Sequence, residues 1–230
     1  MPQGEADRAL SWPKRSALST GRFDGSPVFD FSMLKSYNRH MIGLERGKVT
    51  LYIHNPVWNT EAARTIKVLK EILGDIATET EHVGSTAVNT IMAKPIIDIA
   101  LAVPNFTDII GYNSKLELHG FYYRYAMDRF NNIFRGEIDL TSNNIRQLLY
   151  ACGGYYDGSN KLQTHFIHVV KTESREWRNY IKFRDHLNTH PLVAKEYENL
   201  KIMLYRKYAD NREEYTAHKR DFIQRILNSI

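Results

Sequence analysis

Apolar positions recur along the chain with two different periods, and each period predicts a different kind of element. Between residues 57 and 73 they recur every three to four residues, which predicts an amphipathic helix that starts after Asn55 and Pro56 and stops at Gly74. The neighbouring segments are short and β-branched. They predict strands over residues 48–53, 76–83 and 94–103, followed by a helix over residues 106–119.

The second half of the chain changes from strand patterns to helix patterns at Lys171. Aromatic and β-branched segments before it predict strands over residues 120–127, 145–152 and 164–170. The stretch 128–144 between the first two predicts an excursion outside the core. After Lys171 the spacing becomes helical, with Ser174 and Asp210 as expected helix caps and Pro191 as a restart.

These elements predict an α/β (α+β) fold in which a mixed sheet carries helices and a helical segment follows it. We expect three regions. Residues 1–40 form a mostly irregular N-terminal extension, residues 41–170 form the α/β core, and residues 171–230 form a C-terminal helical segment packed on the core.

Composition limits the class of protein. With 230 residues, of which 43% are hydrophobic and 25% charged, the chain is long enough to bury a core without covalent staples. The single Cys152 excludes an internal disulfide framework and a cysteine-only zinc site. No apolar run reaches membrane-spanning length, and residues 1–22 lack the hydrophobic centre of a secretion signal. We therefore expect a cytoplasmic protein without a membrane partner.

The net charge of +5 is concentrated near the C-terminus, where residues 171–230 hold 13 Lys and Arg against 9 Asp and Glu. These charges alternate in sign along the predicted helices. Three interpretations of this charge are possible. A solvated helix surface is the most expected, a phosphate-facing patch is second, and a nucleic-acid groove is the least expected.

A glycine-serine turn, a lysine and a carboxylate come close together in the sequence around two predicted strands. Gly84 and Ser85 follow the first strand, where backbone N–H groups can face an anion, and Lys94 and Asp98 belong to the next. Phosphate needs positive charge, and its metal ion needs a hard oxygen ligand. Ala100 stands where a second acid would point to the same side of the strand. The alternative is a plain turn beside a hydrogen-bonded strand residue.

Six blocks of the sequence resemble, in order, signature blocks of the GrpB family, whose members are similar to the nucleotidyltransferase superfamily. The blocks are "EHVGSTAV", "AKPIIDI", "HVV", "EWRNYIKFRDHL", "EYENLK" and "DNREEYTAHK", and the resemblance as a whole runs from about residue 41 to residue 222. The resemblance implies a nucleotidyltransferase-like core with trailing helices. Asn89 stands where the family usually has Pro, and Phe166 replaces the first of two histidines and leaves His168.

The resemblance and the residue types together suggest the members of a site. Asp98 and Glu81 are the expected magnesium ligands, with His82 assigned to the turn and His165 as a further candidate near a strand end. His168 is either a proton shuttle or phosphate donor, or a structural histidine. The catalytic candidates are therefore Asp98, Glu81 and His168.

Phosphate binding is expected from the turn and from basic residues. In two pairs, Tyr197 with Lys201 and Tyr215 with Lys219, the two residues lie one helical turn apart. Each pair can therefore present a phenol and an ammonium group on one face, unless the tyrosines pack into the core. The expected nucleotide-binding residues are Gly84, Ser85, Thr86, Lys94, Arg146, Tyr197, Lys201, Tyr215 and Lys219.

Three functions follow from this reading. The leading one is a Mg²⁺-dependent nucleotidyltransferase that uses a nucleoside triphosphate, ATP by preference, to modify or adenylate a small-molecule acceptor. The second is an ATP-dependent amide-bond-forming ligase that passes through an adenylate. The third is a non-catalytic nucleotide-binding or assembly module, which the missing second acid at Ala100 favours.

Overall fold

The computed structural model describes residues 22–23, 26–27, 42–136, 139–153 and 162–230. The chain divides into two compact units, residues 1–36 and 37–230. In the first unit, the two-residue strands β1 (Arg22–Phe23) and β2 (Ser26–Pro27) pair antiparallel. The rest of the expected N-terminal extension lies outside the described residues. All the elements considered below belong to the second unit.

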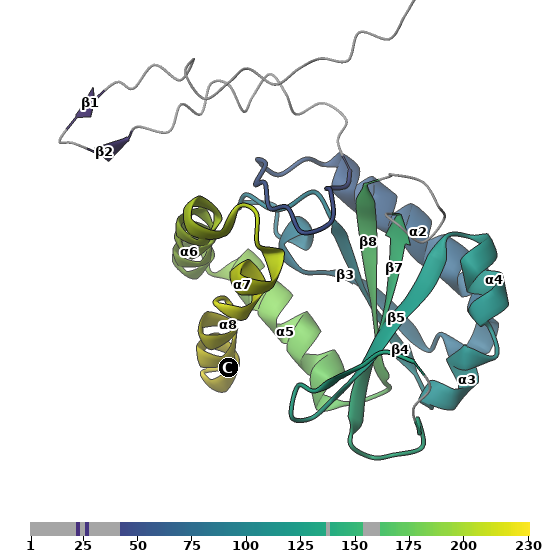
Figure 1. The fold of residues 1–230 in the computed structure, drawn as a ribbon. Coiled ribbons are helices and arrows are strands. Elements are labelled where there is room, and N and C mark those ends of the chain that lie inside the picture. Colours follow the sequence, from purple (N-terminus) through teal and green to yellow (C-terminus); the bar gives the residue numbers. More distant parts are fainter. Residues whose placement is uncertain (1–21, 24–25, 28–41, 137–138, 154–161) are drawn as a thin grey trace, which may run out of the picture. The chain divides into compact units, whose positions relative to one another are not determined.

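Within the described part of the second unit, six strands form one mixed sheet in the order β3-β4-β8-β7-β5-β6 (Figure 1). Strands β4 and β8 run parallel, and the other neighbouring pairs are antiparallel. The mixed α/β sheet predicted from the sequence is therefore confirmed. The strands are β3 (Glu79–Val83), β4 (Ile97–Val103), β5 (Phe121–Asp128), β6 (Ile133–Phe134), β7 (Ile145–Gly153) and β8 (Gln163–Lys171).

Helices cover both faces of this sheet (Figure 1). On one face lie α2 (Val57–Leu73), α3 (Phe106–Ile110) and α4 (Asn113–Leu118). On the other face, α5 (Arg175–Thr189) packs on β3, β4 and β8. The chain then continues through α6 (Pro191–Tyr208), α7 (Arg212–Ala217) and α8 (Arg220–Asn228), and the 3₁₀ turns are η2 (Gly74–Ile76) and η3 (Ser85–Ala87).

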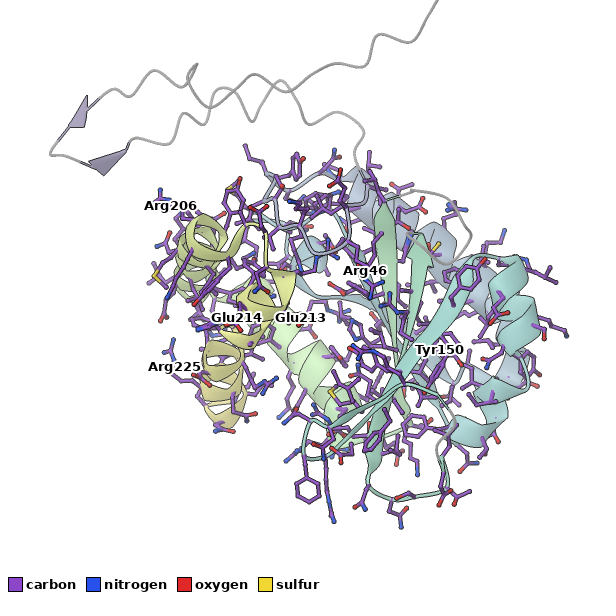
Figure 2. All side chains as sticks on the ribbon, in the orientation of Figure 1. Arg46, Tyr150, Arg206, Glu213, Glu214 and Arg225 are labelled. Carbon is purple, nitrogen blue, oxygen red and sulfur yellow. The ribbon has the colours of Figure 1, made fainter. Side chains whose placement is uncertain are left out.

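The side chains of β4 alternate between two cores. Ile97, Ile99 and Leu101 join the core under α2, whereas Ala100 and Ala102 join the core under α5. The alanines are small, so α5 lies close to the sheet and its Trp177 packs over them. The α2 side holds large side chains instead; Tyr150, labelled in Figure 2, is buried there and donates from its hydroxyl to Asn113 Oδ1 at 2.7 Å.

Several predicted element boundaries are confirmed by local hydrogen bonds. The Ser174 hydroxyl caps α5 by accepting from Trp177 N at 3.1 Å, and Pro191 opens α6. The described residues of the excursion, 128–136 and 139–144, include the edge strand β6, and Phe130 there is 67% exposed. Asp128 Oδ1 holds its first turn by accepting from Phe130 N at 2.8 Å and Asn132 N at 2.9 Å.

Two predictions about regular structure are wrong. Residues 48–53 form a single bridge, between Tyr52 and Ala93, and no strand, because Val49 N donates to Ala209 O after α6 instead of to a sheet edge. The helix expected over residues 106–119 is broken into α3 and α4 at Gly111 and Tyr112.

The C-terminal helix is also divided, and its cap is not the expected one. Asn211, rather than Asp210, caps α7 by accepting from Glu214 N at 3.1 Å. Asp210 pairs with Lys48 at 2.9 Å instead. The chain turns at His218 before α8 begins, so residues that look consecutive on one helix belong to two.

Part of the C-terminal charge lies on the solvent-facing side of the helices, as expected for a solvated helix surface. Arg206 and Arg225 project from α6 and α8, and Glu213 and Glu214 from α7 (Figure 2). Arg225 pairs with Glu196 at 2.5 Å, and exposed pairs of this kind contribute about 0–1 kcal/mol. In the part of the chain that the structure describes, no helix is both long enough and apolar enough to cross a membrane.

Two histidines are held behind the sheet on the α2 side. His82 Nε2 lies 2.9 Å from Thr86 Oγ1, and His165 Nε2 lies 3.1 Å from Thr65 Oγ1. Burial lowers the pKa of each imidazole from 6.5 to about 4, and for His165 it outweighs the nearby carboxylate of Glu61. Both histidines are therefore neutral in the folded protein at neutral pH.

This burial predicts loss of stability in mild acid. Between pH 6.5 and about 4 the unfolded chain binds protons at these histidines and the folded chain does not, so the free energy of unfolding falls as the pH is lowered through that window. His165→Gln is expected to reduce this loss by roughly 1–3 kcal/mol, measured by chemical denaturation at pH 7 and pH 4. His119→Gln, an exposed control, is expected to change nothing. Equal pH dependence in His165→Gln and the unmodified protein would contradict this account.

Candidate functional site

Asp98 is the polar residue at the centre of the site. It lies on β4 between Val83 of β3 and Phe166 of β8, and 28% of its side chain is exposed. Gly84 follows β3 with a φ of +70°, and a Cβ atom there would lie 2.5 Å from Asp98 Oδ2. Glycine is required at this position both for its backbone conformation and for the contact. The predicted turn thus packs directly against the carboxylate.

His168 holds the other oxygen of this carboxylate. Its Nε2 lies 3.1 Å from Asp98 Oδ1, and its Nδ1 lies 3.2 Å from Gln147 Nε2 and 3.1 Å from the Tyr180 hydroxyl. Tyr180 donates its proton to Gln147 Oε1 at 2.7 Å, and an amide nitrogen can only donate. His168 Nδ1 therefore accepts, and the ring proton sits on Nε2 and is donated to Asp98. In this arrangement His168 orients Asp98.

The charge of Asp98 follows from its neighbours. Burial raises the pKa of this carboxyl, but the hydrogen bond from His168 and the charges of the nearby Lys94 and Lys219 outweigh burial and hold it below its ordinary value. Asp98 is therefore ionised at neutral pH. It is a partly buried acceptor at the end of a chain of hydrogen bonds.

Two lysines from distant segments meet on one tyrosine ring beside Asp98. Lys94 Nζ lies 5.2 Å from the centroid of Tyr215 and Lys219 Nζ lies 4.7 Å from it. Both side chains are half-buried. Among the described residues, neither ammonium group forms a hydrogen bond or a salt bridge, although Asp98 acts on both through its charge.

Burial disfavours the charged form of both lysines, and for Lys94 repulsion from neighbouring cations adds to this effect. Burial, followed by repulsion from Lys219 and Arg212, lowers the pKa of Lys94 well below its ordinary value. Burial lowers the pKa of Lys219 to about 8, against the opposing effect of Asp98. Placing the two lysines together therefore destabilises the folded protein, and a bound anion would reduce this destabilisation.

The first Tyr and Lys pair has a different role from the second. Lys201 is 1% exposed and donates to the Met92 carbonyl, so the prediction that it faces phosphate is wrong. Glu198 Oε1 accepts from Met92 N at 2.7 Å. Helix α6 thus binds both backbone groups of Met92 and fixes the segment that leads to Lys94.

Both tyrosines are buried, as the alternative reading of the sequence expected. Tyr197 stacks on Phe222 with ring centroids 5.1 Å apart and forms a hydrogen bond with the Ser85 side chain. It therefore anchors the turn after β3. Tyr215 is 1% exposed, and its ring supports the two lysines.

Three other predicted residues are not part of this group. Glu81 Oε2 accepts from Arg184 at 2.7 Å, so its carboxylate is engaged by α5. Arg146 donates to Asn131 Oδ1 at 2.6 Å at the sheet edge, with β8 between its own strand and β4. Thr86 is buried against His82 and supports the turn from behind.

Arg212 is a residue of the site that the sequence reasoning missed. Its Nε donates to Lys48 O at 2.9 Å and its NH2 to Glu45 O at 2.6 Å, and a third bond goes to Gln163. Burial lowers the pKa of Arg212 to about 10, while Asp98 opposes this shift. A cation in the first turn of a helix is unfavourable for the helix dipole, so its position in the "DNREEY" block was the available signal.

The described residues do not form a resident magnesium site. Asp98 is the one carboxylate at the turn, its Oδ1 is bonded to His168, and two ammonium groups act on it. Ala100 is 0% exposed and packs under α5, which leaves no room for a second acid. Within residues 42–136, 139–153 and 162–230, no three His, Cys, Asp or Glu side chains come together as a metal site.

Comparison with known proteins identifies relatives over most of the chain. The sequence is 34% identical to the glutamate-rich protein GrpB of Alkalihalophilus pseudofirmus, over 83% of this chain and 100% of that one. Its structure is similar to the crystal structure of the conserved protein GrpB from Enterococcus faecalis, with a TM-score of 0.63 and 24% identity over 78% of this chain and 96% of that chain. Cid1 in complex with its short product ApU is matched at a TM-score of 0.35 and 13% identity, over 66% and 44% of the two chains, a likeness too low to argue from. The sequence model described as "GrpB protein" matches residues 48–229, and the chain belongs to the GrpB family.

Proposed function

We propose that this chain binds a nucleoside triphosphate and transfers its nucleotidyl group to a small-molecule acceptor. The observation that carries the proposal is the pair Lys94 and Lys219 on the ring of Tyr215, half-buried and without a salt bridge to any other described residue. Phosphate oxygens accept charge-assisted hydrogen bonds from ammonium groups. Bound phosphates would remove the repulsion between the two lysines.

The residues around the pair suggest how transfer proceeds. The ionised Asp98 accepts the proton of the acceptor hydroxyl or amine, whose oxygen or nitrogen forms a bond to the α-phosphorus. The bond from that phosphorus to its bridging oxygen breaks, and pyrophosphate leaves. Lys94 and Lys219 neutralise the charge that develops on the leaving group. His168 keeps Asp98 oriented throughout.

Support for the nucleoside part of the substrate is the resemblance between the GrpB family and the nucleotidyltransferase superfamily. A carboxylate acceptor at the same site would give an adenylate, and attack by an amine would then complete amide-bond formation. At the turn after β3 the described residues offer a magnesium ion one carboxylate, Asp98, so the two lysines have to meet most of the phosphate charge.

A second candidate, a nucleotide-binding module without turnover, is favoured by one observation. Ala100 stands where a second acid would complete a metal-binding pair, and α5 covers it. Such a module would use the same lysines to bind phosphate. Binding and turnover therefore need separate tests.

Lys94→Ala and Lys219→Ala are each expected to weaken ATP binding by roughly 10- to 100-fold, because each removes a charge-assisted contact. Isothermal titration calorimetry measures this affinity. The unliganded variants are expected to unfold at the same temperature as the parent or higher, since one of two repelling charges is gone. Lys67→Ala, which removes an exposed lysine of α2, is the control. Unchanged affinity in both site variants would exclude phosphate binding at Tyr215.

Asp98→Asn is expected to abolish nucleotidyl transfer, because an amide cannot accept the acceptor's proton. The measurement is release of pyrophosphate, as opposed to phosphate, from ATP in the presence of small alcohols, amines and carboxylates. Asp75→Asn, in the exposed turn η2, is the control. Full turnover by Asp98→Asn would overturn the role of Asp98, and ATP binding without pyrophosphate release by the unmodified protein would favour the module.

A further inference from the structure

Basic groups outnumber acidic groups at the site before any ligand binds. Lys94 and Lys219 lie on one ring, and the guanidinium of Arg212 acts on Lys94. Asp98 is the carboxylate that acts on both lysines. Two lysine amines and one guanidinium against one carboxylate give an excess of basic groups in a half-buried place, and a bound anion would favour the charged forms of these groups.

A divalent cation would make this imbalance worse. It would add two positive charges beside two ammonium groups, at a place where burial strengthens repulsion. The residues that could offset it are engaged elsewhere: Glu81 is bonded to Arg184, and Ala100 is sealed under α5. Triphosphate carries the opposite charge, and it reduces the imbalance without help from a metal ion.

We propose that the site binds the triphosphate group directly, without a divalent cation, and that the ammonium groups of Lys94 and Lys219 neutralise phosphate charge where a metal ion would otherwise do so. This inference rests on the proposed function, since it names the form in which its substrate binds. The ligand is the metal-free polyphosphate anion.

The inference predicts the direction in which removal of the Asp98 charge changes the affinity for triphosphate. If Asp98 held a metal ion that bridges to the phosphates, removing its charge would weaken triphosphate binding. If the phosphates rest on the lysines alone, Asp98 is a like charge close to them and repels them. Removing its charge then strengthens binding, even though it stops proton transfer to Asp98.

The experiment is calorimetric titration of the whole chain with ATP and with inorganic triphosphate, each in excess EDTA and in millimolar Mg²⁺. Affinity in EDTA is expected to equal or exceed affinity in Mg²⁺. Asp98→Asn is expected to bind both ligands several-fold more tightly in EDTA, and Asp75→Asn to match the parent. Thermal unfolding of each unliganded variant checks that it is folded.

The outcomes separate the two proposals. Binding that appears only with Mg²⁺, or weaker binding by a folded Asp98→Asn, would overturn the metal-free inference and leave the proposed function standing. No binding of either ligand under either condition would overturn the proposed function itself. If Asp98→Asn does not fold, the comparison of EDTA with Mg²⁺ on the parent protein still decides the inference.

Discussion

Much of this fold is arranged around an ionised carboxylate near the start of β4, Asp98. Burying a charge costs several kcal/mol unless hydrogen bonds and opposite charges compensate. For Asp98, His168 donates to Oδ1, and the charges of Lys94 and Lys219 act on the carboxylate. Gly84, which has no Cβ, lets the turn after β3 approach Oδ2. His168 is in turn held by Gln147 and Tyr180. A substitution anywhere along this series disturbs the carboxylate.

The C-terminal helices shape the site as well as covering the sheet. Small alanines on β4 bring α5 close to the sheet, and α5 supplies Tyr180 to the hydrogen-bonded series. Helix α6 forms hydrogen bonds with both the N–H and the carbonyl of Met92, and so fixes the position of the segment that leads to Lys94. The turn between α7 and α8 places Lys219 over the ring of Tyr215. These C-terminal helices thus define one side of a site whose other side is the sheet.

The electrostatic balance of the site differs from that of an ordinary salt bridge. One carboxylate faces two ammonium groups, and burial lowers the pKa of both lysines. Burial strengthens attraction and repulsion between charges alike, so it does not remove the repulsion between the two lysines. A bound anion would reduce this repulsion. The large apolar core under α2 provides stability that can offset the cost of this repulsion. Ionisable groups whose pKa is shifted in this way by burial and by neighbouring charges are typical of binding and catalytic sites.

Local patterns in the sequence were sufficient for the mixed sheet, for α2, α5 and α6, and for the grouping of Gly84, Lys94 and Asp98, because period, capping and short-range spacing determine these features. They could not separate the two Tyr and Lys pairs. Both have the same spacing, and in both the ammonium group lies near the phenol ring, at 4.9 Å for Lys201 and 4.7 Å for Lys219.

Contacts between distant segments decide what each lysine does. The Met92 carbonyl, 109 residues away in the chain, binds Lys201, whereas Lys219 is left beside Lys94. Arg184, 103 residues from Glu81, removes that carboxylate from the expected metal site. Residues 48–53 have a strand's composition, but their backbone bonds to Ala93 and Ala209 keep them out of the sheet. Side-chain type limits what a residue can bind, and the packing of remote elements determines which partner it meets.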